Sequence, residues 1–364
     1  MTVFLVDLES VSTRYTCEWK THLPHLLRKA GHNVQIISGP EDIPQATTPG
    51  AFLNFGGTNI YKSSQVEQMG KLFCSGSVAP GDHFIFTDAW HPGIINLKYM
   101  SELLQIPVTT HGLWHAGSYD PQDFLGRLIG DAAWVRHAEK SFYHAFNHNY
   151  FATEFHVRLF VDELLLNGLK SENPWYEEDW AERYDGGKLV RTGWPMEYMD
   201  STLTMYKNMP KRDLILFPHR IAPEKQVEIF RDLATHLPQY EFIVCQDTEL
   251  TKNEYHNLLG EAKIVFSANL QETLGISCYE GAIVDAIPMV PDRLSYSEMY
   301  FEGFKYPSEW TESFESYQAH RPELCAKIIQ YMHNYNQMVP TIRKQTEVLT
   351  EEFFSCNNLL KNIK

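Results

Sequence analysis

Short apolar runs alternate with segments of helical periodicity through the first third of the chain. The apolar runs are continuous, as expected of parallel strands that are buried on both faces. The predicted strands are 3–7, 33–38, 51–57, 83–89 and 107–112, and the predicted helices are 19–30 and 93–104. This alternation predicts an α/β domain built on a parallel sheet.

A second series of the same kind follows an acidic, tryptophan-rich stretch, 173–187, which has little periodicity and is interpreted as a loop or domain boundary. Its predicted strands are 189–195, 213–218, 241–246, 263–268 and 288–292, its helices are 224–237, 254–262 and 276–285, and helical patterns at 322–338 and 341–362 close the chain. We therefore predict two doubly wound α/β domains that face a cleft, at 1–185 and 186–340, followed by a C-terminal helix at 341–364.

Composition agrees with a globular protein of two domains. The chain has 364 residues, of which 43% are hydrophobic and 13% aromatic. It has 31 Lys and Arg against 46 Asp and Glu, a formal net charge of -15. This balance argues against broad binding of a phosphate backbone, although it leaves room for a local basic groove.

No targeting or membrane segment is indicated. The opening residues are apolar for too short a run to be a signal peptide, and no run of about 18 apolar residues occurs. The six cysteines lack CxxC spacing. We expect reduced thiols and a cytoplasmic location.

The stretch HRIAPEKQ, 219–226, places two cations five residues apart directly after an apolar run. Arg220 and Lys225 predict a local anion site in an otherwise acidic chain. A solvated surface is the alternative for such a pair taken alone.

A second stretch, 269–290, spaces two carboxylates around a glycine. If a helix starts near Gly275, the free N–H groups of its first turn favour an anion. Glu280 lies about one turn further along, where a carboxylate can accept hydrogen bonds from the hydroxyls of a sugar or ribose. Glu272 stands before the glycine, and E-x7-E alone is a common pattern.

Together and in this order, the two motifs resemble the donor site of retaining GT-B glycosyltransferases of the family-4 type. In that family an Arg-x4-Lys pair follows the first strand of the second domain, and E-x7-E with an internal glycine precedes a Pro-hydrophobic-Val strand. The resemblance implies the GT-B fold, with two Rossmann-like domains and a last helix that returns to the N-terminal domain. The chain departs from the pattern at His219, at Glu280-Gly281 and in the turn DAIP, 285–288.

The resemblance also implies roles for these residues. Arg220 and Lys225 would neutralise the diphosphate of a nucleotide-sugar, UDP- or GDP-linked, and would stand in place of a metal ion. Glu280 would hold the ribose and Glu272 would face the donor sugar. The amides nearest the phosphate would be those of Leu274 and Gly275.

In the N-terminal domain, the stretch PVTTHG places His111 at the end of a predicted strand. The resemblance implies that this histidine contacts the donor sugar, with His115 as a rival. A structural imidazole is the alternative, since the chain has 16 histidines.

Two further loops supply candidates for the acceptor side. In FTDAWHP, Asp88 and His91 could orient an acceptor hydroxyl, or Asp88 could cap the helix that begins near Pro92. The first strand-to-helix turn, where the family has a glycine-rich loop, carries hydroxyls and a cation: Ser12, Thr13 and Arg14. The glycine-bearing stretch 54–59 is interpreted as a plain turn.

No cofactor or metal site is indicated. The nearest acidic pair is Asp247 and Glu249, in QDTE, and helix capping explains it.

We predict a retaining hexosyl- or pentosyltransferase that moves a sugar from a nucleotide-sugar to an acceptor hydroxyl. The acceptor is open: a glycan, a protein or a small molecule, or hydroxymethylated pyrimidines in DNA, because the chain also resembles bacteriophage-encoded glycosyltransferases. A DNA acceptor would need a restricted basic groove, drawn from Arg14, Lys20, Arg28, Lys62 and Lys71. A sugar-nucleotide epimerase or hydrolase, and an inactive subunit that binds nucleotide-sugars, remain as alternatives.

Overall fold

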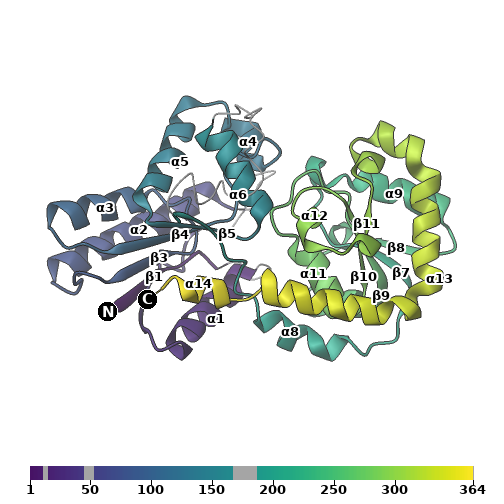
Figure 1. Ribbon diagram of the computed structural model, residues 1–364, viewed down its shortest axis with the longest axis horizontal. Helices are drawn as coiled ribbons and strands as arrows, with labels where there is room; N and C mark the ends of the chain where they lie inside the picture. The colour runs from purple at the N-terminus through teal and green to yellow at the C-terminus, as the bar shows by residue number, and fades with distance from the viewer. Residues whose placement is uncertain (11–14, 45–52, 167–186, 364) are drawn as a thin grey trace. The chain divides into compact units, whose positions relative to one another are not determined.

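The computed structural model describes residues 1–10, 15–44, 53–166 and 187–363. These residues form two compact units: an N-terminal unit of residues 1–195 with 356–364, and a C-terminal unit of residues 196–355. Each unit is built on one parallel sheet (Figure 1).

The sheet of the N-terminal unit has the strand order β2-β1-β3-β4-β5-β6. Its strands are β1 (Thr2–Val6), β2 (Asn33–Ile37), β3 (His83–Phe86), β4 (Thr109–Trp114), β5 (His148–Phe151) and β6 (Leu189–Arg191). The order reverses direction between β1 and β3, and ligands of open α/β sheets bind at the carboxyl ends of the strands that flank such a switch point.

Helices pack on the sheet of the N-terminal unit as right-handed crossovers require. They are α1 (Tyr15–Lys29), α2 (Phe55–Cys74), α3 (Gly93–Leu103), α4 (Phe124–Ile129), α5 (Ala133–Ala145), α6 (Glu154–Phe160) and α14 (Asn357–Lys361). α2, α3 and α5 form one layer, and α1 lies on the other side of the sheet (Figure 1). The core between them is rich in aromatic side chains such as Phe4, Phe84 and Phe86.

The C-terminal unit repeats this plan with the strand order β11-β10-β9-β7-β8. Its strands are β7 (Arg212–Phe217), β8 (Glu241–Val244), β9 (Ala262–Phe266), β10 (Ile287–Pro291) and β11 (Lys305–Tyr306). Its helices are α8 (Tyr198–Leu203), α9 (Val227–His236), α10 (Lys252–Glu261), α11 (Ile276–Ile283), α12 (Tyr296–Met299) and α13 (Phe314–Glu352). The switch point lies between β7 and β9.

Most predicted strands appear within a few residues of their expected positions, and two predictions are wrong. The run 51–57 is not a strand over its described part: α2 begins at Phe55, and the Asn54 side chain caps it by accepting from Gly57 N–H at 2.8 Å. The strand in 189–195 does not open the second domain, because β6 pairs with β5. Residues 186–195 therefore do not start the C-terminal domain as predicted. The stretch 173–186 lies outside the described residues.

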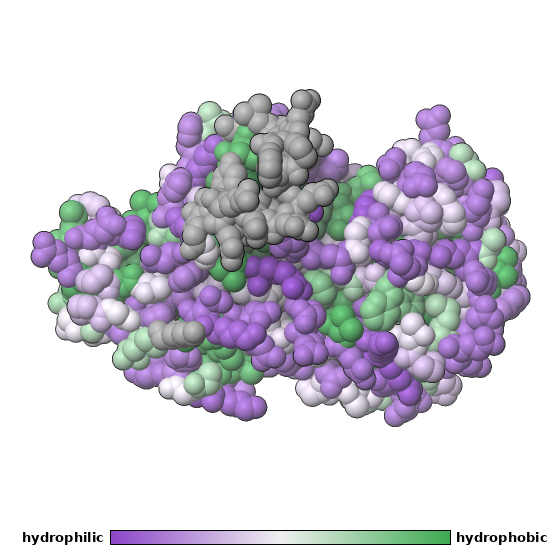
Figure 2. Space-filling view, viewed as in Figure 1, coloured by the Kyte–Doolittle hydropathy of each residue, from purple (hydrophilic) through white to green (hydrophobic). Residues whose placement is uncertain are grey.

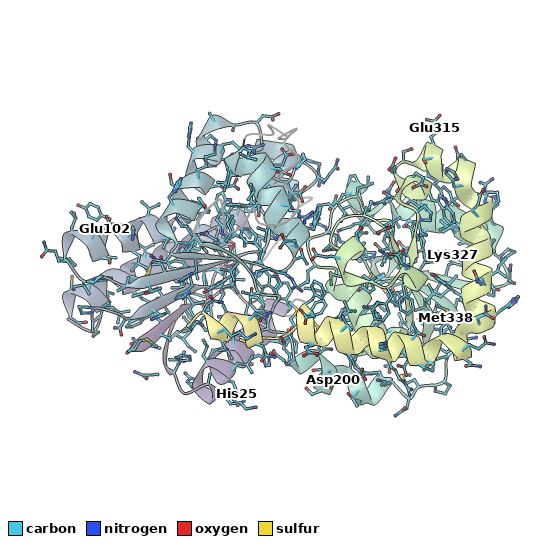
Figure 3. The ribbon with its side chains drawn as sticks, in the orientation of Figure 1. His25, Glu102, Asp200, Glu315, Lys327 and Met338 are labelled. Carbon is cyan, nitrogen blue, oxygen red and sulfur yellow. The ribbon has the colours of Figure 1, made fainter. Side chains whose placement is uncertain are left out.

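The C-terminal helical patterns form one long helix and a short one. α13 runs through both Pro322 and Pro340, whereas the sequence predicts a break near residue 340. The helix bends near Met338 instead (Figures 1 and 3), as expected where proline removes a backbone hydrogen bond. Only 356–364 group with the N-terminal unit, so the predicted returning segment 341–364 is too long.

Most apolar side chains lie in the two cores. The face shown in Figure 2 is mostly hydrophilic, and its apolar patches are small and separate. None of the described helices is long and apolar enough to cross a membrane.

Candidate active site

The two motifs of the C-terminal unit meet at the switch point of its sheet. Arg220 and Lys225 follow β7, and Glu272 and Gly275 follow β9, which is the neighbour of β7. The two loops are joined by a backbone hydrogen bond of 2.8 Å from Leu270 N–H to the Glu224 carbonyl. Residues 47 positions apart, such as Lys225 and Glu272, thus become neighbours because parallel strands end at the same edge.

Lys225 and Glu272 form an ion pair at the centre of this site. The Lys225 Nζ atom lies 3.4 Å from Glu272 Oε2 and donates to the Gln271 carbonyl oxygen. Burial raises the pKa of Glu272, but the Lys225 ammonium and the amides of Gly275 and Leu274 lower it more, so the carboxyl group stays ionised at neutral pH. An ammonium and a carboxylate are therefore held side by side.

Arg220 carries a counter-ion from its own loop. Its Nη2 atom lies 2.5 Å from Glu224 Oε1, and the Glu224 side chain is fully buried. The guanidinium itself is part-exposed, with 29% of its side chain accessible. The buried carboxylate fixes the orientation of the guanidinium and leaves one face of it accessible.

Gly275 caps the start of α11 in a conformation that suits glycine. Its φ is 76°, and a Cβ atom there would lie 2.6 Å from the ring of Tyr296. The preceding residue, Leu274, is buried, and its amide points to Glu272 Oε1 at 3.5 Å. The turn therefore places the amides of Leu274 and Gly275, directly before α11, beside Glu272.

Glu280 lies on α11 and is held by a residue that the motif did not indicate. The hydroxyl of Tyr255, on α10, donates to Glu280 Oε2 at 2.7 Å. Burial raises the pKa of Tyr255 well above its usual value, so the hydroxyl keeps its proton and donates.

His219, which departs from the family pattern, belongs to the same site. Its Nδ1 atom lies 3.3 Å from the Ser277 hydroxyl in the first turn of α11. Burial, reinforced by Lys225, lowers the pKa of His219 to about 3, so the ring is neutral. The ring occupies space beside the helix start that a glycine would leave empty.

His111 is not at a strand end, contrary to the prediction. It is the third residue of β4, has no exposed surface, and bonds through both nitrogens, to His83 at 2.9 Å and to the Tyr150 hydroxyl at 2.8 Å. Burial holds the pKa of His111 well below its usual value. The side chain is part of the sheet packing and cannot reach a substrate.

His115 is the histidine that follows β4. Its Nε2 atom lies 2.6 Å from the Thr87 carbonyl oxygen, which only an N–H can approach, so Nδ1 accepts from the Tyr15 hydroxyl at 2.8 Å. Its ring packs against Trp19 and Trp194. The carboxyl edge of the sheet thus presents His115 together with Tyr15.

Asp88 and His91 have structural partners. Asp88 pairs with Lys62 at 2.7 Å and accepts from Trp90 N–H, so it does not cap α3 as predicted. His91 takes that place: its Nδ1 accepts from Gly93 N–H at 3.0 Å, and its Nε2 bonds the Gln65 side chain. Buried with both nitrogens engaged, His91 is not available to an acceptor, whereas Asp88 remains part-exposed.

The remaining acceptor-side candidates, Ser12, Thr13 and Arg14, lie outside the described residues. The structure adds two carboxylates, Asp7 and Glu9, which follow β1 at the switch point and which sequence reasoning had not singled out. Asp7 accepts from the Tyr61 hydroxyl at 2.5 Å, and Glu9 accepts from the Thr58 hydroxyl. An acidic residue directly after a strand that borders the switch point was the available signal.

Of the cations suggested for a DNA groove, the four that lie within the described residues are each engaged with a neighbour. Lys62 pairs with Asp88, Lys20 lies 3.8 Å from Asp7, and Lys71 pairs with Glu67 at 2.6 Å. Arg28 donates to the Val34 carbonyl oxygen at 3.4 Å. Each of these four cations is therefore already paired or hydrogen-bonded within the chain.

No metal centre occurs within the described part of the chain: no three His, Cys, Asp or Glu side chains there are arranged to hold a metal. Asp247 pairs with Arg231 at 2.6 Å, and the cap of α10 is Thr251, so the predicted capping by the QDTE stretch is wrong.

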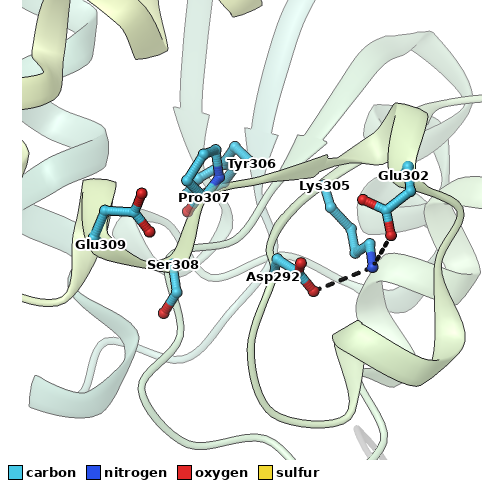
Figure 4. A pocket seen from close by; sticks show the side chains of 7 residues that line it. All are labelled: Asp292, Glu302, Lys305, Tyr306, Pro307, Ser308 and Glu309. Atoms are coloured by element: carbon cyan, nitrogen blue, oxygen red, sulfur yellow. Dashed lines mark ion pairs between the residues drawn. The ribbon is translucent and has the colours of Figure 1, made fainter.

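A separate pocket of about 310 Å³ lies at the carboxyl end of β10 and β11 (Figure 4). Lys305 bridges Asp292 at 3.1 Å and Glu302 at 2.6 Å in its wall. None of the motif residues lines this pocket.

Solved structures share this architecture along nearly the whole chain. Sucrose-phosphate synthase from Thermosynechococcus elongatus has a TM-score of 0.59 and 10% identity, over 99% of this chain and 97% of that chain. The catalytic domain of starch synthase IV from Arabidopsis thaliana, bound to ADP and acarbose, has a TM-score of 0.58 and 9% identity, over 99% and 97%. Anabaena HepE in complex with UDP has a TM-score of 0.55 and 10% identity, over 99% and 98%.

These neighbours and the two Rossmann-like units establish the fold as GT-B. The sequence matches no protein-family model. It matches no curated protein sequence either. The likeness to known proteins is therefore one of structure.

Proposed function

We propose that this protein is a retaining glycosyltransferase that uses a nucleotide-sugar, UDP- or GDP-linked, as donor. The observation that carries the proposal is the meeting of both motifs at the β7–β9 switch point, with Lys225 and Glu272 3.4 Å apart beside the start of α11. The neighbours bound to UDP or ADP support a nucleoside diphosphate as the ligand of this fold.

The diphosphate is assigned to Arg220, Lys225 and the first amides of α11, next to Leu274 and Gly275. Negative charge grows on the leaving diphosphate as the glycosidic bond breaks, and fixed cations and helix N–H groups stabilise that charge. The diphosphate meets the accessible part of the Arg220 guanidinium while Glu224 stays paired with it, and it competes with Glu272 for the Lys225 ammonium.

The ribose is assigned to Glu280 and the transferred sugar to Glu272. An ionised carboxylate accepts hydrogen bonds from vicinal hydroxyls, and the depressed pKa of Glu272 keeps it in that form. Retention follows from the family resemblance, with the acceptor attacking on the face that the phosphate leaves and passing its proton to that phosphate.

We assign to His115, at the carboxyl edge of the N-terminal sheet, the substrate contact that the sequence assigned to His111. We expect His115→Ala to lower turnover about tenfold to a hundredfold when it is assayed well below its own melting temperature. His111→Ala should instead lower the free energy of unfolding by about 1–3 kcal/mol, because it leaves buried polar atoms unpaired. Steady-state kinetics and denaturant unfolding of both variants test this; a His115 variant with full activity contradicts it.

For the acceptor, the described residues favour an uncharged hydroxyl compound over DNA. The strand ends at the switch point of the N-terminal sheet carry Asp7 and Glu9, both buried, and Asp88, which neutralises Lys62, so these residues leave no excess of positive charge for phosphate there. A glycan, a protein hydroxyl or a small polyol suits this surface. Hydroxymethylated DNA is included among the acceptors in the experiment described next.

The deciding experiment measures release of free nucleoside diphosphate from UDP-, GDP-, ADP- and TDP-sugars, with and without each acceptor class. Acceptor-dependent release is expected, and Lys225→Ala should reduce it by a factor on the order of 10² to 10³. Lys263→Ala is the matched control, because Lys263 pairs with Asp213 and lies near the amino end of β9, away from the site.

The alternatives give different results in this assay. Release without any acceptor indicates a hydrolase, and conversion of the sugar without release of diphosphate indicates an epimerase. Binding without turnover indicates an inactive subunit. No binding of any donor overturns the proposal.

A further inference from the structure

Two side chains of the C-terminal unit donate to the same pair of backbone carbonyls. Gln226 Nε2 lies 2.6 Å from the Ala268 oxygen and 2.7 Å from the Thr311 oxygen. Arg293 Nη2 lies 2.7 Å and 3.2 Å from the same two oxygens. Because both targets are acceptors, the amide of Gln226 must present its nitrogen to them. We call these four residues the carbonyl clamp.

The clamp ties together the two loops that carry the donor motifs. Gln226 directly follows Lys225, and Ala268 begins the loop that leads to Glu272. Arg293 also donates through Nε to the next carbonyl of that loop, Asn269, at 2.7 Å. The loop before α13, through Thr311, is the third element held by the clamp.

The backbone of Gln226 is unusual for its residue type. Its φ of 52° and ψ of 48° lie in the left-handed region, which glycine adopts at lower cost than any side chain. Glycine would remove this strain, but it would also remove the amide that bridges the carbonyls. A strained backbone conformation that persists directly after Lys225 points to a role for the Gln226 side chain.

We propose that Gln226 and Arg293 are positioning residues that set the separation between the Lys225 ammonium and the Glu272 carboxylate. The two groups are held as an ion pair of 3.4 Å, and loops free to move would let it close into a shorter, stronger pair that competes with the diphosphate. With both backbones held by the clamp, the two groups stay in place for the donor. The proposal rests on the donor site assigned above.

Two substitutions separate the side chain from the backbone strain. Gln226→Asn keeps a residue that tolerates the left-handed region but shortens the amide by one methylene, and Gln226→Gly removes both strain and amide. We expect both to lower kcat/KM for the donor about tenfold or more, since small misplacement of catalytic groups costs up to a hundredfold. Full activity in both variants would show that only the backbone conformation matters, and would overturn the proposal.

Hydrogen exchange tests the clamp independently of catalysis. The Leu270 amide, bonded to the Glu224 carbonyl between the two loops, should exchange at least tenfold faster in Gln226→Asn and in Arg293→Lys. Lysine keeps the charge of Arg293 but cannot reach all of its carbonyl partners. Unchanged exchange in both variants overturns the clamp, even if the wild type turns over no nucleotide-sugar.

Gln345→Asn is the matched control. Gln345 is another buried glutamine of the C-terminal unit that bridges backbone groups, accepting from Phe301 N–H and donating to the Met299 carbonyl oxygen. It contacts neither motif loop through these bonds. We expect this variant to lose stability while the Leu270 exchange rate, relative to global unfolding, stays that of the wild type; a faster Leu270 rate would overturn the specific role of the clamp.

Discussion

At the scale of single residues, Tyr255 shows how a carboxylate of the site is oriented from outside the motif. Its hydroxyl donates to Glu280 from a different helix. We expect Tyr255→Phe to weaken binding of the nucleoside diphosphate by roughly 1 kcal/mol, or about fivefold, because one hydrogen bond to a charged group is lost. Isothermal titration of both proteins measures this difference.

Tyr206→Phe provides the control for this prediction. The Tyr206 hydroxyl donates to Asn253 Oδ1 at 2.6 Å. Asn253 lies on the same helix as Tyr255, but this hydrogen bond does not involve Glu280. Its removal should leave nucleotide affinity unchanged. Equal losses in the two variants would mean that the Tyr255 effect is one of general stability.

Asp285 opens the turn DAIP with a φ of 64°, a conformation that glycine adopts at lower cost than aspartate. Here the strain is accompanied by contacts with Arg343, at 2.8 Å and 3.2 Å from the carboxylate. We expect Asp285→Ala to be less stable than Asp285→Gly by about 1 kcal/mol, because both lose the ion pair and only alanine keeps the strain. Urea unfolding of the two variants measures the difference, and equal stability contradicts the explanation.

At the scale of elements, three neighbouring strands of the N-terminal sheet carry a stacked row of histidines. The rings of His83, His111 and His148 follow one another at centroid distances of 5.1 Å across β3, β4 and β5. Burial lowers the pKa of all three. The row is stable only while the rings are neutral.

This row predicts a loss of stability in mild acid. Histidine in the unfolded chain has a pKa near 6.5, and the pKa values in the folded protein are lower. At pH values between the folded and unfolded pKa, the unfolded chain therefore binds more protons than the folded one. The free energy of unfolding should therefore have its full value above about pH 6.5 and fall as the pH drops to 5.5. Urea midpoints at pH 7.5 and 5.5 measure this, and equal midpoints contradict it.

Variants identify the source of that pH dependence. His148→Asn should flatten it, because one buried titrating ring is gone. His25→Asn should not, since His25 is exposed on α1 (Figure 3). If both variants flatten the pH dependence of stability, the row of buried histidines is not its source.

At the scale of the whole molecule, the last residues of the chain belong to the N-terminal unit. Within 356–364, Cys356, Leu359 and Ile363 are almost fully buried. Each large apolar side chain removed from a core costs about 1.5–3 kcal/mol. Deleting 356–364 should therefore lower the stability of the N-terminal unit by several kcal/mol.

Scanning calorimetry of the truncated protein tests this prediction. The transition of the N-terminal unit should move to lower temperature while that of the C-terminal unit stays in place. Deletion of Lys364 alone is the control. An unchanged thermogram after deletion of 356–364 would show that the segment adds nothing to the core.

By itself, the sequence determined the α/β class, most strands, and the two charged motifs around Lys225, Glu272 and Glu280. Local patterns carry that information: buried parallel strands are continuous apolar runs, and the charged residues of each motif lie within one loop or one helix turn. Gly275 also marked the start of a helix in the sequence, because a helix start with positive φ favours glycine.

Tertiary structure alone decided which sheet β6 joins, which histidine reaches the carboxyl edge, and which side chains hold the motif loops. The domain to which a strand of three residues belongs is set by the distant strand that it pairs with, so its own hydrophobic pattern does not predict that domain. His111 and His115 differ by four residues, and only the register of β4 buries one and presents the other. Gln226, Arg293 and Tyr255 act through contacts between residues 25 to 85 positions apart, which only the folded chain brings together.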